Sequence, residues 1–99
     1  GDEHLQILSN KGVSGIHLCG ENDLIEVLSY CFSGFKIELL SIIPEKDLLD
    51  YPEQSANPSL PELKSGELIL LASLEHQAKL TEFMTLRGLQ RNRHWVLFF

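Results

Sequence analysis

The sequence predicts a small α/β domain with a doubly wound, parallel sheet of four strands in the order 2-1-3-4. Apolar runs typical of buried strands alternate along the chain with stretches whose apolar residues recur at helical spacing. Parallel strands joined by right-handed crossovers place the first and third strands side by side. The run ELILLAS at residues 67–73 is apolar without interruption, which is typical of a strand buried on both faces. We therefore place it at the centre of the sheet.

The remaining elements are predicted from changes in the spacing of apolar residues and from turn residues. The first strand, residues 13–19, stops at Gly20, after which apolar residues at helical spacing predict a helix over 22–33. A short lead-in helix over 2–10 precedes it. The second strand, 35–43, ends at Pro44, and all four prolines lie within a long surface connection over 44–66 with one helical turn at 60–64. A helix over 74–86 and an apolar strand over 94–99 complete the chain.

Length, composition and charge narrow the class of protein. The 99 residues, 43% of them hydrophobic, fit one domain over 1–99 and no second domain. A net charge of -6 argues against a nucleic-acid partner, and the only basic cluster, from Arg87 to His94, is short and suits a helix C-terminus and its loop. No apolar run could span a bilayer and the first residues lack signal-peptide features, so we expect a cytoplasmic protein without membrane insertion. The apolar ending WVLFF suggests a fragment of a longer protein.

The carboxyl ends of the first and third strands form the expected crevice. In α/β proteins, a helix N-terminus at this edge of the sheet offers free N–H groups and a positive dipole end to anionic ligands. The residues expected to line this crevice are Gly20, Glu21, Asn22, Asp23, Ser73 and His76, with Glu75 nearby.

The order of elements resembles a known family. The chain resembles the small Rossmann-like domain of bacterial nucleotide-sugar and polysaccharide-biosynthesis enzymes. The resemblance lies in the order of its elements: an apolar strand with a glycine turn, a helix, a second strand, the strand ELILLAS, a helix ending in RGL and a final strand. The resemblance covers about residues 2–99 and implies an NAD(P) or nucleotide-sugar site at the glycine turn. In that family the turn reads Gly-x-Gly followed by a small residue. Gly20 matches the first glycine, whereas Asn22 and Ile25 stand at the second and third positions.

These departures predict an eroded crevice. The second glycine of such a turn lets the backbone approach a pyrophosphate and the third permits close packing of helix on strand. Glu21 and Asp23 place carboxylates where phosphates would sit, and they suit a helix N-terminus instead. The family's acidic residue at the end of the second strand is replaced by Pro44, with Glu45 one place on.

Two other chemistries deserve comparison. Cys19, before a helix N-terminus, resembles the nucleophile of the phosphocysteine subunit of sugar phosphotransferase systems, but the loop GENDL lacks that family's Gly, Ser and Thr and its acidic side chains would raise the thiol pKa. His76 could serve as a general base opposite Cys19, although a single histidine on a first helical turn usually faces solvent. The other histidines have no metal-ligand spacing: His4, His17 and His94.

We therefore expect a non-catalytic regulatory or assembly module with no cofactor, no catalytic residue and no metal ligand. The first alternative is an NAD(P)- or nucleotide-sugar-binding domain of a carbohydrate-biosynthesis enzyme, and the second is the phosphocysteine subunit. The expected partner is a second copy of the chain or another domain of its parent protein. We expect Trp95 and Phe98 to form an exposed apolar patch at the sheet edge, because the strand over 94–99 has no following helix.

Overall fold

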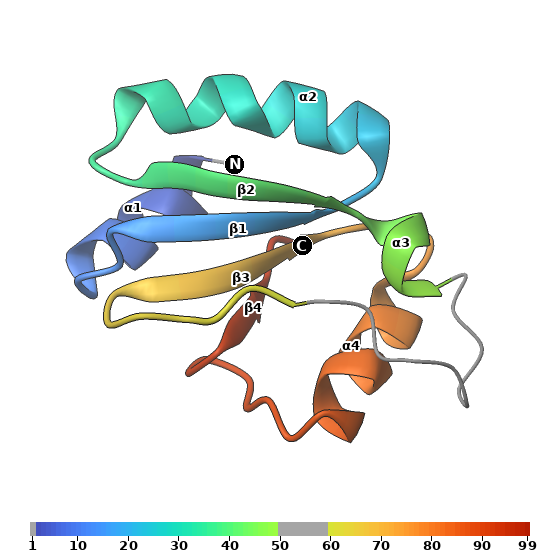
Figure 1. Cartoon of the computed structure of the whole chain (residues 1–99). Coiled ribbons are helices and arrows are strands. Elements are labelled where there is room, and N and C mark those ends of the chain that lie inside the picture. The colour runs from blue at the N-terminus through green and yellow to red at the C-terminus, as the bar shows by residue number, and fades with distance from the viewer. Residues whose placement is uncertain (1, 50–59) are drawn as a thin grey trace.

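The computed structural model describes residues 2–49 and 60–99, and it confirms the predicted sheet. Four parallel strands lie in the order β2-β1-β3-β4 (Figure 1). The elements are, in chain order, α1 (Asp2–Asn10), β1 (Gly15–Gly20), α2 (Asn22–Cys31) with a 3-10 turn (Phe32–Gly34), β2 (Glu38–Pro44), α3 (Glu45–Leu49), β3 (Glu67–Ala72), α4 (Gln77–Leu86) and β4 (Trp95–Leu97). The expected central run ELILLA is buried almost throughout.

Two apolar cores cover the two faces of the sheet. On one face, α1 and α2 pack their buried residues, among them Leu5 and Leu28, against Ile16 and Leu70. On the other face, α3 and α4 pack on the alternate residues of the same strands. The second core consists of Cys19, Leu48, Ile69, Leu71, Leu80, Met84 and Trp95. Among the described residues, two helices therefore cover each face, and the strands contribute to both cores because their side chains alternate between the faces.

The structure corrects the expected connection between the second and third strands. Pro44 closes β2 and is followed directly by α3, a helix that the sequence analysis did not predict. The helical turn expected at 60–64 is absent, since residues 60–64 have no regular secondary structure. The central part of that connection, residues 50–59, lies outside the described residues.

The expected apolar patch on the last strand is also wrong. Trp95 is 2% exposed and lies in the core beneath α4, with its indole Nε1 donating to the carbonyl of Leu89 at 3.2 Å. Phe98 is 7% exposed and packs in the opposite core, while its N–H bonds to the carbonyl of Leu71 at 2.9 Å. The patch was expected because α3 was not predicted. In the structure, α3 and α4 together cover the face on which Trp95 lies.

Ile25, which stands at the position of the third glycine of the turn, lies between α2 and the sheet. Its side chain is 6% exposed and belongs to the core between α2 and the sheet. The position that a third glycine would hold is therefore a core position here. A change to alanine at Ile25 would remove apolar packing from this core.

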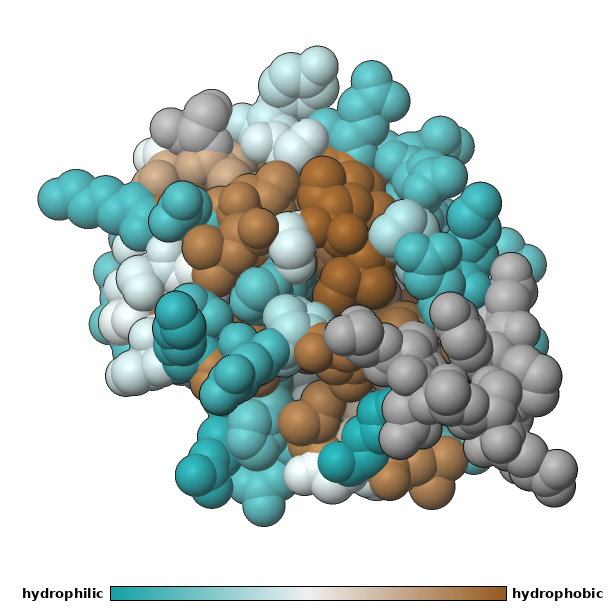
Figure 2. Space-filling model, in the orientation of Figure 1, coloured by the Kyte–Doolittle hydropathy of each residue, from teal (hydrophilic) through white to brown (hydrophobic). Residues whose placement is uncertain are grey.

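The free edge of β2 carries apolar side chains. A β-bulge between Ile16 and His17 leaves Leu40 without a paired partner on β1. Leu40 and Ile42 are 36% and 49% exposed. Brown, apolar surface gathers in the middle of the face shown in Figure 2, where Figure 1 places β2.

Candidate functional site

The candidate site lies where β1 and β3 end. Gly20 closes β1 and pairs with Ala72 at the end of β3. A Cβ on Gly20 would lie 2.0 Å from the carbonyl oxygen of Ala72, which is far inside van der Waals contact. The glycine is therefore required by the close approach of two strands. The requirement for glycine at this position does not depend on a bound phosphate. It explains why Gly20 matches the first glycine of the family's turn.

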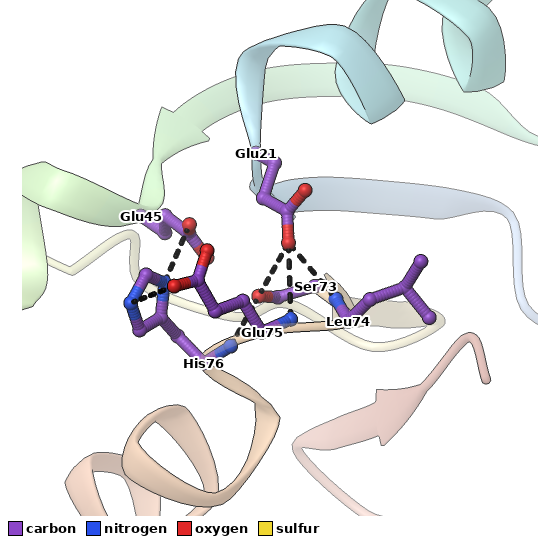
Figure 3. Close-up of polar contacts among 6 residues, drawn as sticks. All are labelled: Glu21, Glu45, Ser73, Leu74, Glu75 and His76. Atoms are coloured by element: carbon purple, nitrogen blue, oxygen red, sulfur yellow. Dashed lines mark hydrogen bonds and ion pairs between the residues drawn. The ribbon is translucent and has the colours of Figure 1, made fainter.

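Glu21 reaches from β1 across to the loop after β3. Its Oε1 accepts hydrogen bonds from the backbone N–H groups of Leu74 at 3.0 Å and Glu75 at 3.2 Å, and from the hydroxyl of Ser73 at 3.3 Å (Figure 3). Three donors on consecutive residues converge on one oxygen, an arrangement that binds anions. The carboxylate of Glu21 is thus the anion in this loop.

Electrostatics agree with that geometry. The backbone hydrogen bonds from Glu75 and Leu74 lower the pKa of Glu21 below its ordinary value, because they stabilise the charged form. Ser73 is itself held in place, since it is 1% exposed and its Oγ accepts a hydrogen bond from the N–H of His76 at 3.0 Å. The anion-binding loop is therefore ordered around Glu21 by its own hydrogen bonds.

A second acidic residue, Glu45, lies beside the loop. Its Oε1 is 2.9 Å from Nδ1 of His76 (Figure 3). Its Oε2 is buried and has no hydrogen-bond partner among residues 2–49 and 60–99. Glu45 directly follows β2, at the edge where the resembled family has its acidic residue, and α3 then turns its side chain toward His76. The pairing of Glu45 with His76 was not predicted from the sequence.

The structure brings four of the six expected crevice residues together. Gly20, Glu21, Ser73 and His76 lie at one edge and are linked by hydrogen bonds or by strand pairing. Asn22 and Asp23 are exposed on the first turn of α2, and neither side chain hydrogen-bonds to a described residue. Glu21 was expected to serve its own helix, yet it makes no capping hydrogen bond there.

Cys19 does not have the properties of a nucleophile. Burial, followed by the nearby carboxylates of Glu45 and Asp47, raises the pKa of its thiol to about 12. The thiolate is the reactive form, and at such a pKa it is scarce at neutral pH. Cys19 instead packs in the core beneath α3 and α4, which argues against the phosphocysteine alternative.

A further polar chain, which the sequence analysis missed, crosses three strands. His17, 7% exposed, has Nδ1 at 2.6 Å from the hydroxyl of Ser41 and Nε2 at 3.4 Å from Oε1 of Glu67. Both ring nitrogens therefore have partners on the neighbouring strands. We interpret these contacts as satisfying the hydrogen-bonding groups of a buried histidine, because polar groups removed from water need hydrogen bonds.

No metal centre is found in residues 2–49 and 60–99, where no group of three or more His, Cys, Asp or Glu side chains could hold an ion. Within the same residues, no helix is long and apolar enough to cross a membrane. The groups suited to hold a phosphate are the N–H groups of Leu74 and Glu75 with the Ser73 hydroxyl, and these already bind Glu21.

Comparison of the chain with models of protein families, with curated proteins and with solved structures gives no significant match. Conclusions about function therefore depend on the geometry of the molecule.

Proposed function

We propose that this domain is a non-catalytic, Rossmann-like regulatory or assembly module whose nucleotide crevice is closed by its own Glu21. One observation carries the proposal: a single oxygen of Glu21 accepts all three hydrogen bonds that the Ser73–Leu74–Glu75 loop directs to an anion. A nucleotide phosphate would have to displace an ordered carboxylate from these donors. It would do so without the high local concentration that the covalently attached carboxylate has.

Charge at the same edge opposes a phosphate further. The carboxylates of Glu21 and Glu45 both lie beside the loop, and Glu45 is paired with His76. A phosphate entering there would bring two or more negative charges close to them, which costs free energy in a partly buried site.

The two free cysteines suit a reducing compartment, and we include a cytoplasmic location in the proposal.

The second candidate is an NAD(P)- or nucleotide-sugar-binding domain of a carbohydrate-biosynthesis enzyme. The convergence of backbone N–H groups before α4 favours it, because such groups bind pyrophosphate when no side chain occupies them. The resemblance to polysaccharide-biosynthesis domains points the same way. This candidate requires Glu21 to swing away from the loop when the ligand binds.

Thermal-shift and calorimetric titrations separate the two candidates. NAD(H), NADP(H) and UDP-glucose at millimolar concentration should not raise the melting temperature of the wild-type domain. A ligand at a hundred times its dissociation constant stabilises the folded state by about 2.7 kcal/mol. A shift of that size for any of these ligands would favour the second candidate and contradict the first.

As the assembly surface we propose the open edge of β2, paired with β2 of a second copy. This strand has seven residues and ends the sheet, and the exposed side chains of Glu38, Leu40 and Ile42 alternate along it. Free edges of this kind tend to pair, because their outward N–H and C=O groups lack partners. Antiparallel pairing of two β2 strands would give a two-fold symmetric dimer with one continuous sheet.

Sedimentation equilibrium tests this surface. We expect a dimer at high micromolar concentration for the wild type and a monomer for Ile42→Lys, because a charge at the edge opposes pairing. Val27→Lys, a matched change at an exposed position of α2, should leave the dimer intact. A wild-type mass of one chain would contradict the assembly surface.

A further inference from the structure

A cavity lies at the edge of the sheet opposite to Glu21, where the strands begin. It measures about 680 Å³ and is bordered by the residues that precede β1, β3 and β4. The strands are parallel, so these three segments meet at the amino edge, away from Glu21. Ligand pockets for small molecules commonly enclose roughly 300–1,000 Å³, and this cavity falls within that range.

Positive charge gathers in this cavity from distant parts of the sequence. Lys11 precedes β1, Lys64 precedes β3 and Arg93 precedes β4, and all three line the cavity. None of them forms an ion pair with another described residue. The chain as a whole carries a net charge of -6, so its composition does not predict a cluster of three cations. In sequence only Arg93 belongs to a visible basic cluster.

One carboxylate, that of Glu67, shares the cavity with the three cations. Its Oε1 accepts the backbone N–H of Lys64 at 3.2 Å and lies 3.4 Å from Nε2 of His17. The hydrogen bond from Lys64 lowers the pKa of Glu67, which keeps it charged. The three cations and the one carboxylate leave an excess of two positive charges, which a dianion would balance.

Hydrogen-bond donors accompany the charge. Ser14 and Ser65 place hydroxyl groups at the cavity wall, and Gly66 lies between them and β3. Gly66 has φ +82°, and a Cβ there would lie 2.8 Å from Oγ of Ser14, so the glycine leaves the hydroxyl uncovered. Nδ1 of His94 accepts the N–H of Gln90 at 2.8 Å, which places the proton of the neutral ring on Nε2.

We infer that this amino-edge cavity binds a small organic phosphate or diphosphate through Lys11, Lys64 and Arg93. A phosphate group supplies the dianion and the acceptor oxygens that these cations and hydroxyl groups require. The cavity is separate from the Glu21 loop, so it is open to an anion whether or not the carboxyl edge is closed. The inference therefore goes beyond the proposed function and does not depend on it.

The test is an amide NMR titration of the ¹⁵N-labelled chain with pyrophosphate, and in a second arm with AMP, at low salt. Saturable shifts are expected at Gly12, Ser65 and Arg93. Lys64→Gln and Arg93→Gln should each weaken binding about tenfold, the effect of losing one charge-assisted hydrogen bond. Lys79→Gln, an equal loss of charge on the exposed side of α4, should leave the affinity unchanged.

The outcomes are distinguishable. Linear, non-saturating shifts, or equal weakening by all three substitutions, would overturn the inference, since either result indicates general charge screening. Saturable shifts at Leu74 and Glu75 with none at Ser65 would overturn it as well, and would also contradict the closed crevice. Binding of pyrophosphate but not of AMP would restrict the ligand to diphosphates. The surface substitutions lie outside both cores, and the unliganded spectra verify the fold.

Discussion

Oε1 of Glu21 lies 3.0 Å from the backbone nitrogen of Leu74, a residue 53 positions further along the chain. This contact joins the end of β1 to the loop before α4, the two places that border a nucleotide crevice in doubly wound folds. The chain therefore carries an internal anion where such folds receive an external one. In the function that we propose, this contact closes the crevice, and the missing glycines are secondary.

The pH dependence of stability should report on Glu21. Its pKa is lowered in the folded state from 4.5, so its contribution is complete above that value and is lost as the pH falls through the lower, folded value. In urea denaturation from about pH 5 to about pH 3, Glu21→Gln should lose less stability than the wild type. Glu26→Gln, at an exposed position of α2, is the control and should follow the wild type. Identical slopes for all three proteins would contradict the contact.

Gly20→Ala should destabilise the domain by about 3 kcal/mol or more, because its Cβ would meet the backbone carbonyl of Ala72 and neither strand can move freely. Gly34→Ala is the matched control: a Cβ there meets nothing within 4 Å, and we expect a change within about 0.5 kcal/mol. Thermal denaturation followed by circular dichroism measures both. A Gly20→Ala variant as stable as the wild type would show that the strands do not approach so closely.

Ile25→Ala should cost about 2–4 kcal/mol, the usual effect of truncating a buried isoleucine, because this side chain packs between α2 and the sheet. Val27→Ala, two positions along the same helix but 60% exposed, should change stability by less than about 0.5 kcal/mol. Chemical denaturation compares them. Equal effects would mean that α2 presents a different face to the sheet.

Cys19 should resist alkylation in the folded protein. Burial and neighbouring carboxylates raise the pKa of its thiol to about 12, so both access and thiolate are lacking. In a Cys31→Ser background, mass spectrometry should find iodoacetamide adducts only as urea unfolds the chain. Rapid labelling at neutral pH without urea would instead indicate an accessible, activated thiol.

The sheet could be predicted from sequence because its signals are local and strong. The apolar run of β3 and the change of period at Gly20 each lie within a few residues, and crossover handedness then restricts the strand order. The helix α3 was missed because its five residues are too few to show a period, and they follow a proline that reads as the start of a loop. The burial of Trp95 was missed for the same reason, since α3 completes the layer on its face.

The candidate site was predictable in place but not in role. Parallel strands bring Gly20, Glu21 and Ser73 to one edge, which the topology alone requires. The role of Glu21 could not be predicted, because a carboxylate at a helix start has a sufficient local explanation in the helix dipole. Its actual partners lie more than fifty residues away. The basic cavity was missed similarly, since Lys11, Lys64 and Arg93 are adjacent only after folding.

The most direct test of the closed crevice is a pH titration of the backbone amide signals of Leu74 and Glu75. We predict that both signals move together with a single midpoint below 4.5, as protonation of Glu21 weakens the hydrogen bonds that these N–H groups donate. In Glu21→Gln the same transition should be absent. Amide signals that do not titrate in the wild type, or that titrate equally in the Gln variant, would contradict the conclusion that Glu21 occupies the anion site.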